Sequence, residues 1–344
     1  MDSVEMRKRL QTAVDTLLNK DSEFWQLSRA IKELRVLFLS LSPILAPENK
    51  EFLSGETHLP SGLAIAPDFA ATVLSDTKRT VKFLRGVKEA IDDCLINIDN
   101  KPIHLLYAGC GPYATLVFPL LHFFKPDQLK VTLLDIHQLS LDSADTIAHK
   151  IGVVDFIDSL ICCDASRYLH PKDDPIHMVV TETMAQLLYK EPQVSITLNL
   201  APQMVSDGIF IPEEVIISLR AINTANDYLR LTNMLLKNGK VELHLQDIFT
   251  LDKNCLNLVD TESNGMQIWL EDIIIPEIPE QFDQLKLFTE IKIYNNHFLQ
   301  AYESGLTSPL DFKIDEVKEG DSISFMYQIS HVPELKYTKI QSYQ

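Results

Sequence analysis

Three acidic residues stand directly after apolar, strand-like runs of the sequence. The runs Val131–Leu134, Phe156–Cys163 and His177–Thr181 lead into Asp135, Asp164 and Glu182, respectively. Ligands of open parallel sheets bind beyond the carboxyl ends of the strands, so these side chains are candidates for binding or catalysis. A carboxylate at such a place can accept hydrogen bonds from hydroxyls or amines, bind a cation, or act as a general base.

A glycine turn interrupts an earlier apolar run. Ile103–Tyr107 leads into Gly109-Cys110-Gly111, and Asp135 follows about twenty residues on. Backbone without side chains lets a nucleotide come close, and an acidic residue at this place of a strand–helix–strand unit accepts hydrogen bonds from ribose hydroxyls. The combination predicts a nucleotide-like ligand, bound in part by Gly109, Gly111 and Asp135.

Two ligand classes fit this turn to different degrees. A dinucleotide turn requires a third glycine near the pyrophosphate, but Tyr113 and Ala114 stand there. The pair Asp164-Ala165 resembles the adenine-binding corner of class I methyltransferases, with an acidic side chain for the exocyclic amine and a backbone amide beside it. S-adenosylmethionine is therefore the better fit.

Composition excludes several classes of protein. The chain has 344 residues, 46% of them hydrophobic and 23% charged, as expected of a globular protein with room for two domains. A net charge of −17 disfavours binding to nucleic acid or anionic membranes. No apolar stretch approaches the ~20 residues of a membrane span and no signal peptide is evident, so we expect a cytoplasmic protein. The five cysteines lack CxxC spacing and the ten histidines lack HxH or HxxxH spacing, so reduced thiols and no metal site are expected.

The pattern of apolar residues divides the chain into three regions. Residues 1–58 show helical periodicity up to Pro43 and Pro47, followed by a polar linker, which predicts a helical hairpin that packs on the rest or forms a dimer. Residues 59–212 begin with a helix from Pro67 and continue with alternating strands and helices, including a helix from Ala114. This alternation predicts a mostly parallel sheet. Residues 213–344 consist of short runs of period two, which predict an antiparallel β domain, with a helical insert near 226–237 as a possible dimer contact.

The segment that follows the third acidic strand end resembles a known motif. In Thr181–Glu191, the two glutamates Glu182 and Glu191 are nine residues apart, and Met184 lies between them. This arrangement resembles the "double-E" hairpin of protein arginine methyltransferases, with Thr181 in place of a serine. Asp76-x-x-Arg79 resembles the cofactor-covering helix of that family, Gly109-x-Gly111 its first motif, and Asp207–Pro212 the strand before its β-barrel.

Other positions differ from the family pattern. Tyr107 replaces the acidic residue of the first motif, Tyr113 replaces its third glycine, and Asp135 replaces the usual ribose-binding glutamate. The Thr-His-Trp motif of the barrel is absent, which favours a small substrate over a protein. His297 is a candidate for the missing barrel histidine.

The resemblance implies a fold, a cofactor and a set of site residues. The fold is a Rossmann-like, seven-stranded methyltransferase domain with N-terminal helices and a C-terminal antiparallel β-barrel. Catalysis is assigned to Glu182 and Glu191. The remaining site residues are, for substrate, Met184 and His297 and, for S-adenosylmethionine, Arg79, Gly109, Gly111, Tyr113, Asp135, Asp164 and Ala165.

The chemistry of the acidic pair supports a guanidinium acceptor. Guanidinium has no free lone pair, and two carboxylates on its other nitrogens would localise the positive charge there and make the target nitrogen more nucleophilic. We therefore expect methylation of free arginine, a related small molecule or protein arginine, and a homodimer is the candidate assembly. Three alternatives stay open: a different amine, hydroxyl or carbon acceptor, with Glu182 as general base; a non-catalytic S-adenosylmethionine-binding regulator or scaffold; and a nucleotide-dependent oxidoreductase.

Overall fold

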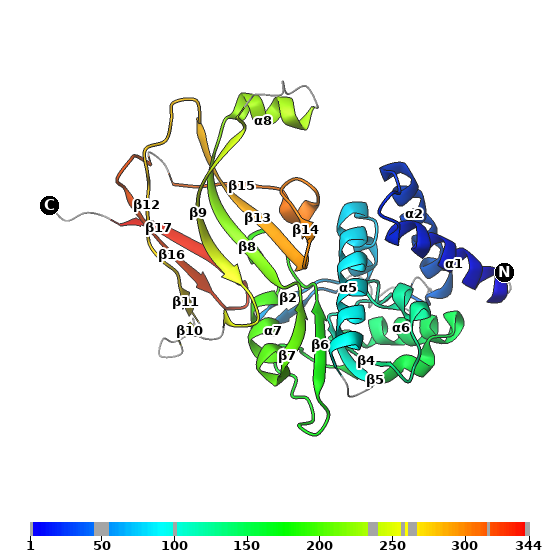
Figure 1. Cartoon of the computed structure of the whole chain (residues 1–344). Coiled ribbons are helices and arrows are strands. Elements are labelled where there is room, and N and C mark those ends of the chain that lie inside the picture. The colour runs from blue at the N-terminus through cyan, green and yellow to red at the C-terminus, as the bar shows by residue number, and fades with distance from the viewer. Residues whose placement is uncertain are drawn as a thin grey trace.

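The computed structural model describes residues 3–44, 55–98, 102–232, 240–255, 259–260, 267–314 and 317–340. Figure 1 shows three parts: N-terminal helices, a parallel sheet flanked by helices, and an antiparallel β region on the other side of the sheet. This arrangement follows the order predicted from the sequence, with helices first, alternating strands and helices next, and antiparallel strands last.

The N-terminal part is the expected helical hairpin. Helices α1 (Ser3–Leu18) and α2 (Phe24–Leu41) bury apolar side chains at helical spacing against the rest of the core. The turn between them ends at Glu23, whose side chain and that of Gln26 form a reciprocal capping box at the start of α2. Lys150 on α6 (Gln138–Ile151) donates to the carbonyl of Leu41, so the hairpin is joined to the sheet domain.

A two-stranded hairpin and a short helix precede the sheet. Strands β1 (Thr57–Leu59) and β2 (Gly62–Ala64) are antiparallel, and β1 begins within the segment predicted to be a linker. Helix α4 (Pro67–Val73) starts at Pro67, as expected for a residue whose missing N–H is not needed there. The long helix α5 (Thr77–Asn97) follows, with Asp76 as its N-cap.

The central sheet is parallel throughout and Rossmann-like, which confirms the predicted fold class. Its strand order is β5-β4-β3-β6-β7. The strands and the two helices that follow β4 and β6 are β3 (Ile103–Ala108), β4 (Leu129–Asp135), α6 (Gln138–Ile151), β5 (Ile157–Cys162), β6 (Ile176–Thr181), α7 (Gln193–Leu200) and β7 (Met204–Ile211).

Two details of this domain differ from expectation. The sheet has five strands in the described part of the chain, not seven, because after β7 the chain turns at Pro212 and β8 pairs in the antiparallel region instead. The helix expected from Ala114 is a series of turns followed by a 3-10 helix, Phe118–Phe123. Ala114 has φ +42°, outside the helical range, and Pro119 lacks a donor, so a regular α-helix cannot begin there.

The C-terminal part consists of two antiparallel sheets, as predicted. Alternation along β16 places Ile323, Phe325 and Tyr327 inside and the residues between them nearer the surface. The first sheet contains β8 (Glu214–Ile222), β9 (Glu242–Leu251), β13 (Gln284–Tyr294), β14 (His297–Leu299) and β15 (Leu310–Asp311). The second contains β10 (Val259–Asp260), β11 (Gln267–Trp269), β12 (Ile273–Ile274), β16 (Ser322–Gln328) and β17 (Glu334–Ile340).

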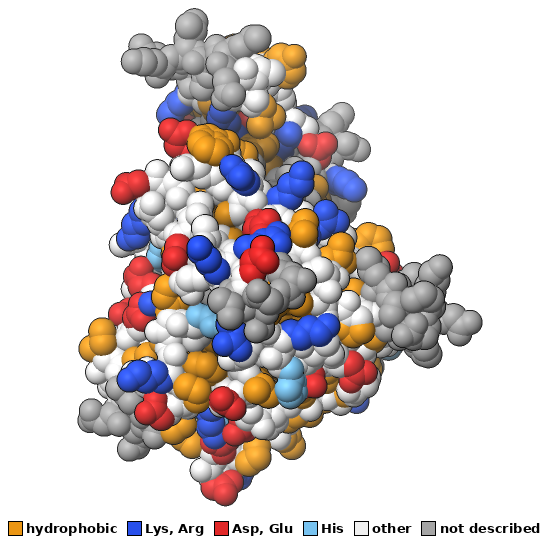
Figure 2. All heavy atoms as spheres, turned by 90° about the vertical axis from the view of Figure 1, so that its right-hand side faces the viewer, with side chains coloured by type: hydrophobic (Ala, Val, Ile, Leu, Met, Phe, Trp, Pro, Cys, Tyr) orange, Lys and Arg blue, Asp and Glu red, His pale blue; other side chains and the backbone are white. Residues whose placement is uncertain are grey.

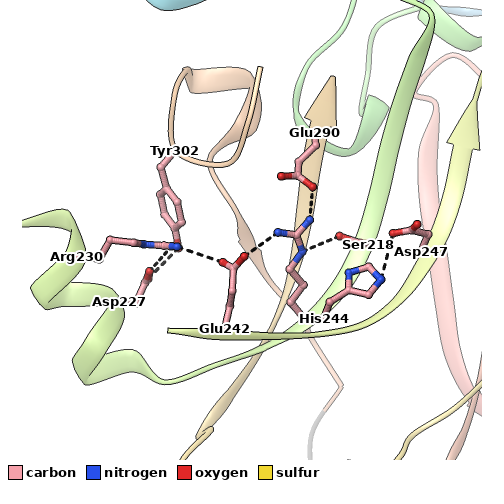
Figure 3. A network of polar contacts seen from close by, with 9 residues as sticks. Ser218, Asp227, Arg230, Glu242, His244, Asp247, Glu290 and Tyr302 are labelled. Carbon is pink, nitrogen blue, oxygen red and sulfur yellow. Dashed lines mark hydrogen bonds and ion pairs between the residues drawn. The ribbon is translucent and has the colours of Figure 1, made fainter. Parts of the chain in front are cut away.

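The helical insert is α8 (Thr224–Leu231), which begins two residues before the predicted start; residues 233–237 of the prediction lie outside the described residues. A polar network anchors it to the β region (Figure 3): Arg230 lies between Asp227 and Glu242, and the ring of Tyr302 lies against its guanidinium. Tyr228 and Leu231 are exposed, and the dimer contact stays a prediction.

The surface on the side of the N-terminal helices carries mixed charge. Figure 2 shows basic and acidic side chains interspersed on this face rather than gathered into one patch. Among the described helices, none is both long enough and apolar enough to cross a lipid bilayer.

Candidate active site

A cavity of about 430 Å³ lies beyond the carboxyl ends of the parallel strands. Its walls come from the ends of β3, β4, β5 and β6, from α4 and the start of α5, and from Gly305 and Leu306 of the β region. Nine of the predicted site residues line it: Arg79, Gly109, Gly111, Asp135, Asp164, Ala165, Glu182, Met184 and Glu191. The fold therefore brings together residues that are up to 112 positions apart, from 79 to 191.

The glycine turn has the conformation that only glycine adopts easily. Gly109 and Gly111 have φ of +69° and +62°. Gly109 directly follows β3. A Cβ atom there would lie 2.3 Å from Cγ2 of Thr183, so the backbone at Gly109 approaches the loop after Glu182 too closely for any side chain. The turn is closed by Asp135, whose Oδ2 accepts from the backbone N–H of Gly111 at 2.9 Å.

The carboxylates of Asp135 and Asp164, at the ends of β4 and β5, are each oriented by hydrogen bonds from neighbouring residues. The Oδ1 of Asp135 also accepts from the backbone N–H of His137 at 2.9 Å, and its carboxylate keeps lone pairs for a ligand. The Oδ1 of Asp164 accepts from the backbone N–H and the hydroxyl of Ser166 at 2.9 and 2.7 Å. Both carboxylates are thus held at the cavity wall in one orientation.

The acidic pair lies at the same cavity. The side chain of Glu182 is 6% exposed and its Oε2 forms an ion pair with Arg79, which reaches over from α5. Burial raises the pKa of Glu182, although the Arg79 guanidinium opposes the shift. Burial, and then repulsion from Glu182, raise the pKa of Glu191 to about 8. Two buried carboxyls whose pKa values are both raised form a site that favours a cation.

One feature of the Arg79–Glu182 pair points to a ligand. Arg79 Nε and Glu182 Oε1 are both buried, and neither has a hydrogen-bond partner among the described residues. An unpaired buried donor or acceptor costs ~1–3 kcal/mol, more when the group is charged. The pair therefore has one position free for an anionic group and one free for a cationic or hydrogen-bond-donating group.

The loop that carries Glu191 is held by the β region. Leu187, Leu188 and Lys190 all have positive φ, between +57° and +67°, which costs ~1–2 kcal/mol for each side-chain-bearing residue. The backbone of Leu187 donates to the hydroxyl of Thr289, the hydroxyl of Tyr327 donates to the carbonyl of Leu188, and the backbone of Lys190 donates to the carbonyl of Pro333. These contacts fold the loop back so that Glu191 returns to the cavity.

Two predicted site residues lie away from the cavity wall. Tyr113 is 2% exposed and packs its ring against Phe38 of α2, with ring centroids 5.6 Å apart. His297 is on β14, and its Nε2 lies 2.9 Å from Oε2 of Glu89 on α5. The cofactor role of Tyr113 and the substrate role of His297 are therefore not retained, because neither side chain faces the cavity.

Sequence reasoning missed several residues of the site. Gln193 accepts from both the backbone N–H and the hydroxyl of Thr183 through its Oε1, and so orients the residue beside Glu182. Asp76, which the sequence placed only in the motif of the cofactor-covering helix, caps α5 and accepts from the hydroxyl of Ser304 in the β region. The Asp-x-x-Arg spacing is sufficient to predict Asp76 as an N-cap, whereas nothing in the sequence indicates the contact between Gln193 and Thr183.

Arrangement and site together define a Rossmann-like parallel-sheet domain whose strand-end cavity is completed by an antiparallel β region. No protein-family model matches the chain, and no curated protein matches its sequence. Among solved structures, it is similar to Arabidopsis thaliana protein arginine methyltransferase 10, in a uniquely open conformation, with 10% identity, a TM-score of 0.50, and coverage of 89% of this chain and 96% of that one.

It also matches the Trypanosoma brucei PRMT1 enzyme–prozyme heterotetrameric complex with AdoHcy, with 13% identity, a TM-score of 0.46, and coverage of 78% of this chain and 96% of that one. The chain has the fold of the protein arginine methyltransferases, as the sequence resemblance implied. At these identities the likeness concerns the fold, and the activity has to be argued from the site.

Proposed function

We propose that the chain is an S-adenosylmethionine-dependent N-methyltransferase that acts on a guanidinium group. The acceptor is free arginine, a related small molecule, or an arginine side chain of a protein. The observation that supports this proposal most is the open Arg79–Glu182 pair beside Glu191: one cavity offers an unpaired buried guanidinium N–H and two carboxyls with raised proton affinity.

The cavity residues fit the cofactor. When bound, S-adenosylmethionine supplies a methyl group on a sulfonium. Asp135 and Asp164 offer carboxylate oxygens to ribose hydroxyls and to the adenine amine, respectively. The turn at Gly109 carries no side chain, so its backbone is accessible to the ligand. Arg79 has a free N–H for the carboxylate of the methionine moiety.

The acidic pair fits the acceptor. Glu182 Oε1 and the carboxyl of Glu191 would bind two nitrogens of a guanidinium and so concentrate its charge away from the third, which attacks the methyl carbon. The nitrogen forms the new N–C bond, the electrons of the broken C–S bond stay on sulfur, and the nitrogen releases one proton. The carboxyl of Glu191, once ionised beside the bound guanidinium cation, can accept that proton, because burial and repulsion from Glu182 raise its pKa.

Two measurements test the proposal in sequence. Calorimetric titration of the full chain with S-adenosylhomocysteine and, separately, with NAD decides the ligand class. Transfer of a radiolabelled methyl group is then followed over free arginine, agmatine, arginine-containing peptides, and lysine analogues of the same peptides. We expect binding of S-adenosylhomocysteine, no binding of NAD, and transfer only to guanidino compounds.

Each alternative predicts a different result. Binding without transfer to any acceptor would indicate a regulator or scaffold, and transfer to the lysine peptides or to hydroxyl compounds would indicate a different acceptor. Binding of NAD alone would overturn the proposal. Glu280→Gln, an exposed change on the β region, serves as the matched control for Glu182→Gln in the transfer assay.

A further inference from the structure

A second polar cluster lies at the other end of the parallel sheet. His104 is the second residue of β3, five positions before Gly109 at the strand's opposite end. His170 and Asp174 come from the connection between β5 and β6. None of the three lines the active-site cavity, so their function is separate from the proposed methyl transfer.

Three ligand-type atoms of this cluster converge. His104 Nδ1 and His170 Nε2 each lie 3.2 Å from Oδ2 of Asp174. All three atoms are within 4.8 Å of one another. The two imidazole rings are tilted by 59° with centroids 4.9 Å apart, so they do not stack face to face.

Both of these nitrogens are buried and unpaired. His104 is 0% exposed and the side chain of His170 is 5% exposed. Despite the short distances to Asp174, His104 Nδ1 and His170 Nε2 make no hydrogen bond of acceptable direction with any described residue. Hydrogen bonds to Asp174 alone therefore do not account for the cluster.

We propose that His104, His170 and Asp174 bind a divalent transition-metal ion of the Zn²⁺ class. Around a tetrahedral ion with Zn–N and Zn–O bonds of 2.0–2.1 Å, neighbouring donor atoms are about 3.3 Å apart, close to the observed nitrogen–oxygen distances. Imidazole and carboxylate ligands suit Zn²⁺ and Co²⁺ better than Mg²⁺ or Ca²⁺. The carboxylate of Asp174 is 29% exposed, which leaves a route for the ion and a fourth position for water.

The surroundings orient these ligands as neighbours of bound metals do. The other nitrogen of His104 lies 2.8 Å from Oγ1 of Thr132, and that of His170 lies 3.0 Å from the hydroxyl of Tyr168.

A basic residue also contacts the cluster, and it leaves the proposed ligand atom free. Lys130 Nζ donates to Oδ1 of Asp174 at 2.7 Å and lies 3.7 Å from Asp158, while the two histidines approach Oδ2. Asp158 and Asp174 together outweigh Lys130 by one negative charge, so a cation remains favoured there.

A bound ion would join the start of β3 to the connection that leads toward the cofactor residues. This connection begins near Asp164 and Ala165 at the cavity wall. Asn199 of α7 donates to the carbonyls of Ala165 and Tyr168 at 2.9 and 2.8 Å, which holds the first part of this connection against α7. We therefore assign the ion a structural role.

The test uses the untagged full chain, because a histidine tag would itself bind the ion. After dialysis against a chelator, the protein is titrated calorimetrically with ZnCl₂, and with CoCl₂ while visible absorption is recorded. We expect one ion per chain, the d–d bands of tetrahedral Co²⁺, and a thermal unfolding midpoint that rises with added Zn²⁺. No stoichiometric binding to the wild-type chain would overturn the proposal.

Two adjacent aspartates provide a matched pair of variants. Asp174→Asn should weaken Zn²⁺ binding by at least roughly tenfold, because even the loss of a residue that only supports a ligand has an effect of that size. Asp173→Asn, on an exposed neighbour, should bind like wild type. Equal Zn²⁺ affinity of the two variants would exclude Asp174 as a ligand. If Asp174→Asn fails to fold by circular dichroism, the wild-type Co²⁺ spectrum still decides between imidazole–carboxylate ligation and none.

Discussion

Two buried arginine–glutamate clusters in this chain differ in how completely they are paired. In the β region, Arg220 donates from Nε to Ser218 and from its two terminal nitrogens to Glu242 and Glu290, and its guanidinium lies 4.6 Å from the ring centroid of Phe288. At the cavity, Arg79 pairs with Glu182 through a single contact, and Arg79 Nε and Glu182 Oε1 stay unpaired.

This difference in pairing distinguishes a cluster that stabilises the fold from one that is available to a ligand. A buried ion cluster is stable when hydrogen bonds satisfy each partner, and Figure 3 shows such a chain of contacts through Glu242 between the strands and α8. A cluster with open positions loses that stabilisation, and a ligand that fills the positions recovers it. The predictions below test whether the cavity cluster serves a ligand and the β-region cluster serves the fold.

The largest effect is expected for Glu182→Gln. The variant keeps the shape of the side chain but removes the negative charge that faces the acceptor, so methyl transfer should fall by about 10³-fold or more. Affinity for S-adenosylhomocysteine should stay within about threefold of wild type, since the adenosine-binding residues are unchanged. The radiolabel assay and calorimetry measure the two quantities. Transfer at the wild-type rate would show that the cavity cluster is no more catalytic than the β-region cluster.

Arg220→Met should show the opposite behaviour. It breaks the paired cluster and leaves Glu242 and Glu290 without their shared partner, so the free energy of unfolding should fall by about 2–4 kcal/mol. Methyl transfer per folded molecule should match wild type. Urea unfolding gives the first quantity and the transfer assay the second. A large loss of methyl transfer with unchanged stability would contradict a purely structural role of the Arg220 cluster.

Arg79→Lys should weaken cofactor binding selectively. A lysine cannot reproduce the planar fork that holds a carboxylate at two positions, so affinity for S-adenosylhomocysteine should fall by roughly 10–100-fold. Methylthioadenosine, which lacks the amino-acid part, should bind wild type and variant equally. An equal loss for both ligands would mean that Arg79 acts on the cavity as a whole and not on the carboxylate.

Glu191→Gln should raise stability in alkaline solution. The pKa of Glu191 in the folded chain, about 8, lies above the ordinary value of 4.5, so the folded state holds a proton that the unfolded state has released. Stability of the wild type therefore falls as pH rises from about 4.5 to about 8. The variant lacks this loss and should be more stable by roughly 1–2 kcal/mol above pH 8, with no such difference below pH 4. Urea midpoints across this range measure it, and a constant difference at all pH values would rule out ionisation of Glu191 as the cause.

Much of the fold, and several of the residues that line the cavity, can be predicted from the sequence alone. Helical spacing in residues 3–41, the glycine turn after Ile103, and acids at the ends of β4 and β5 all report local burial and backbone freedom, which a short stretch of chain determines. The switch to period two after Pro212 likewise reports strands with one buried face. These features appear in the structure where they were expected.

Other features depend on contacts between distant segments. The return of Glu191 to the cavity requires Thr289, Tyr327 and Pro333. Tyr113 was read as a cofactor residue, but the N-terminal hairpin covers it through Phe38.

The sequence by itself therefore determined the order of elements and the chemical character of the cavity, because periodicity and strand-end residues are local. Only the tertiary structure decided which charges meet: Arg79 with Glu182, His297 with Glu89, and His104 with His170 and Asp174. The histidine cluster shows the reason most clearly. Its first two members are 66 positions apart with no metal-binding spacing, and they become neighbours only because the connection between β5 and β6 passes the start of β3.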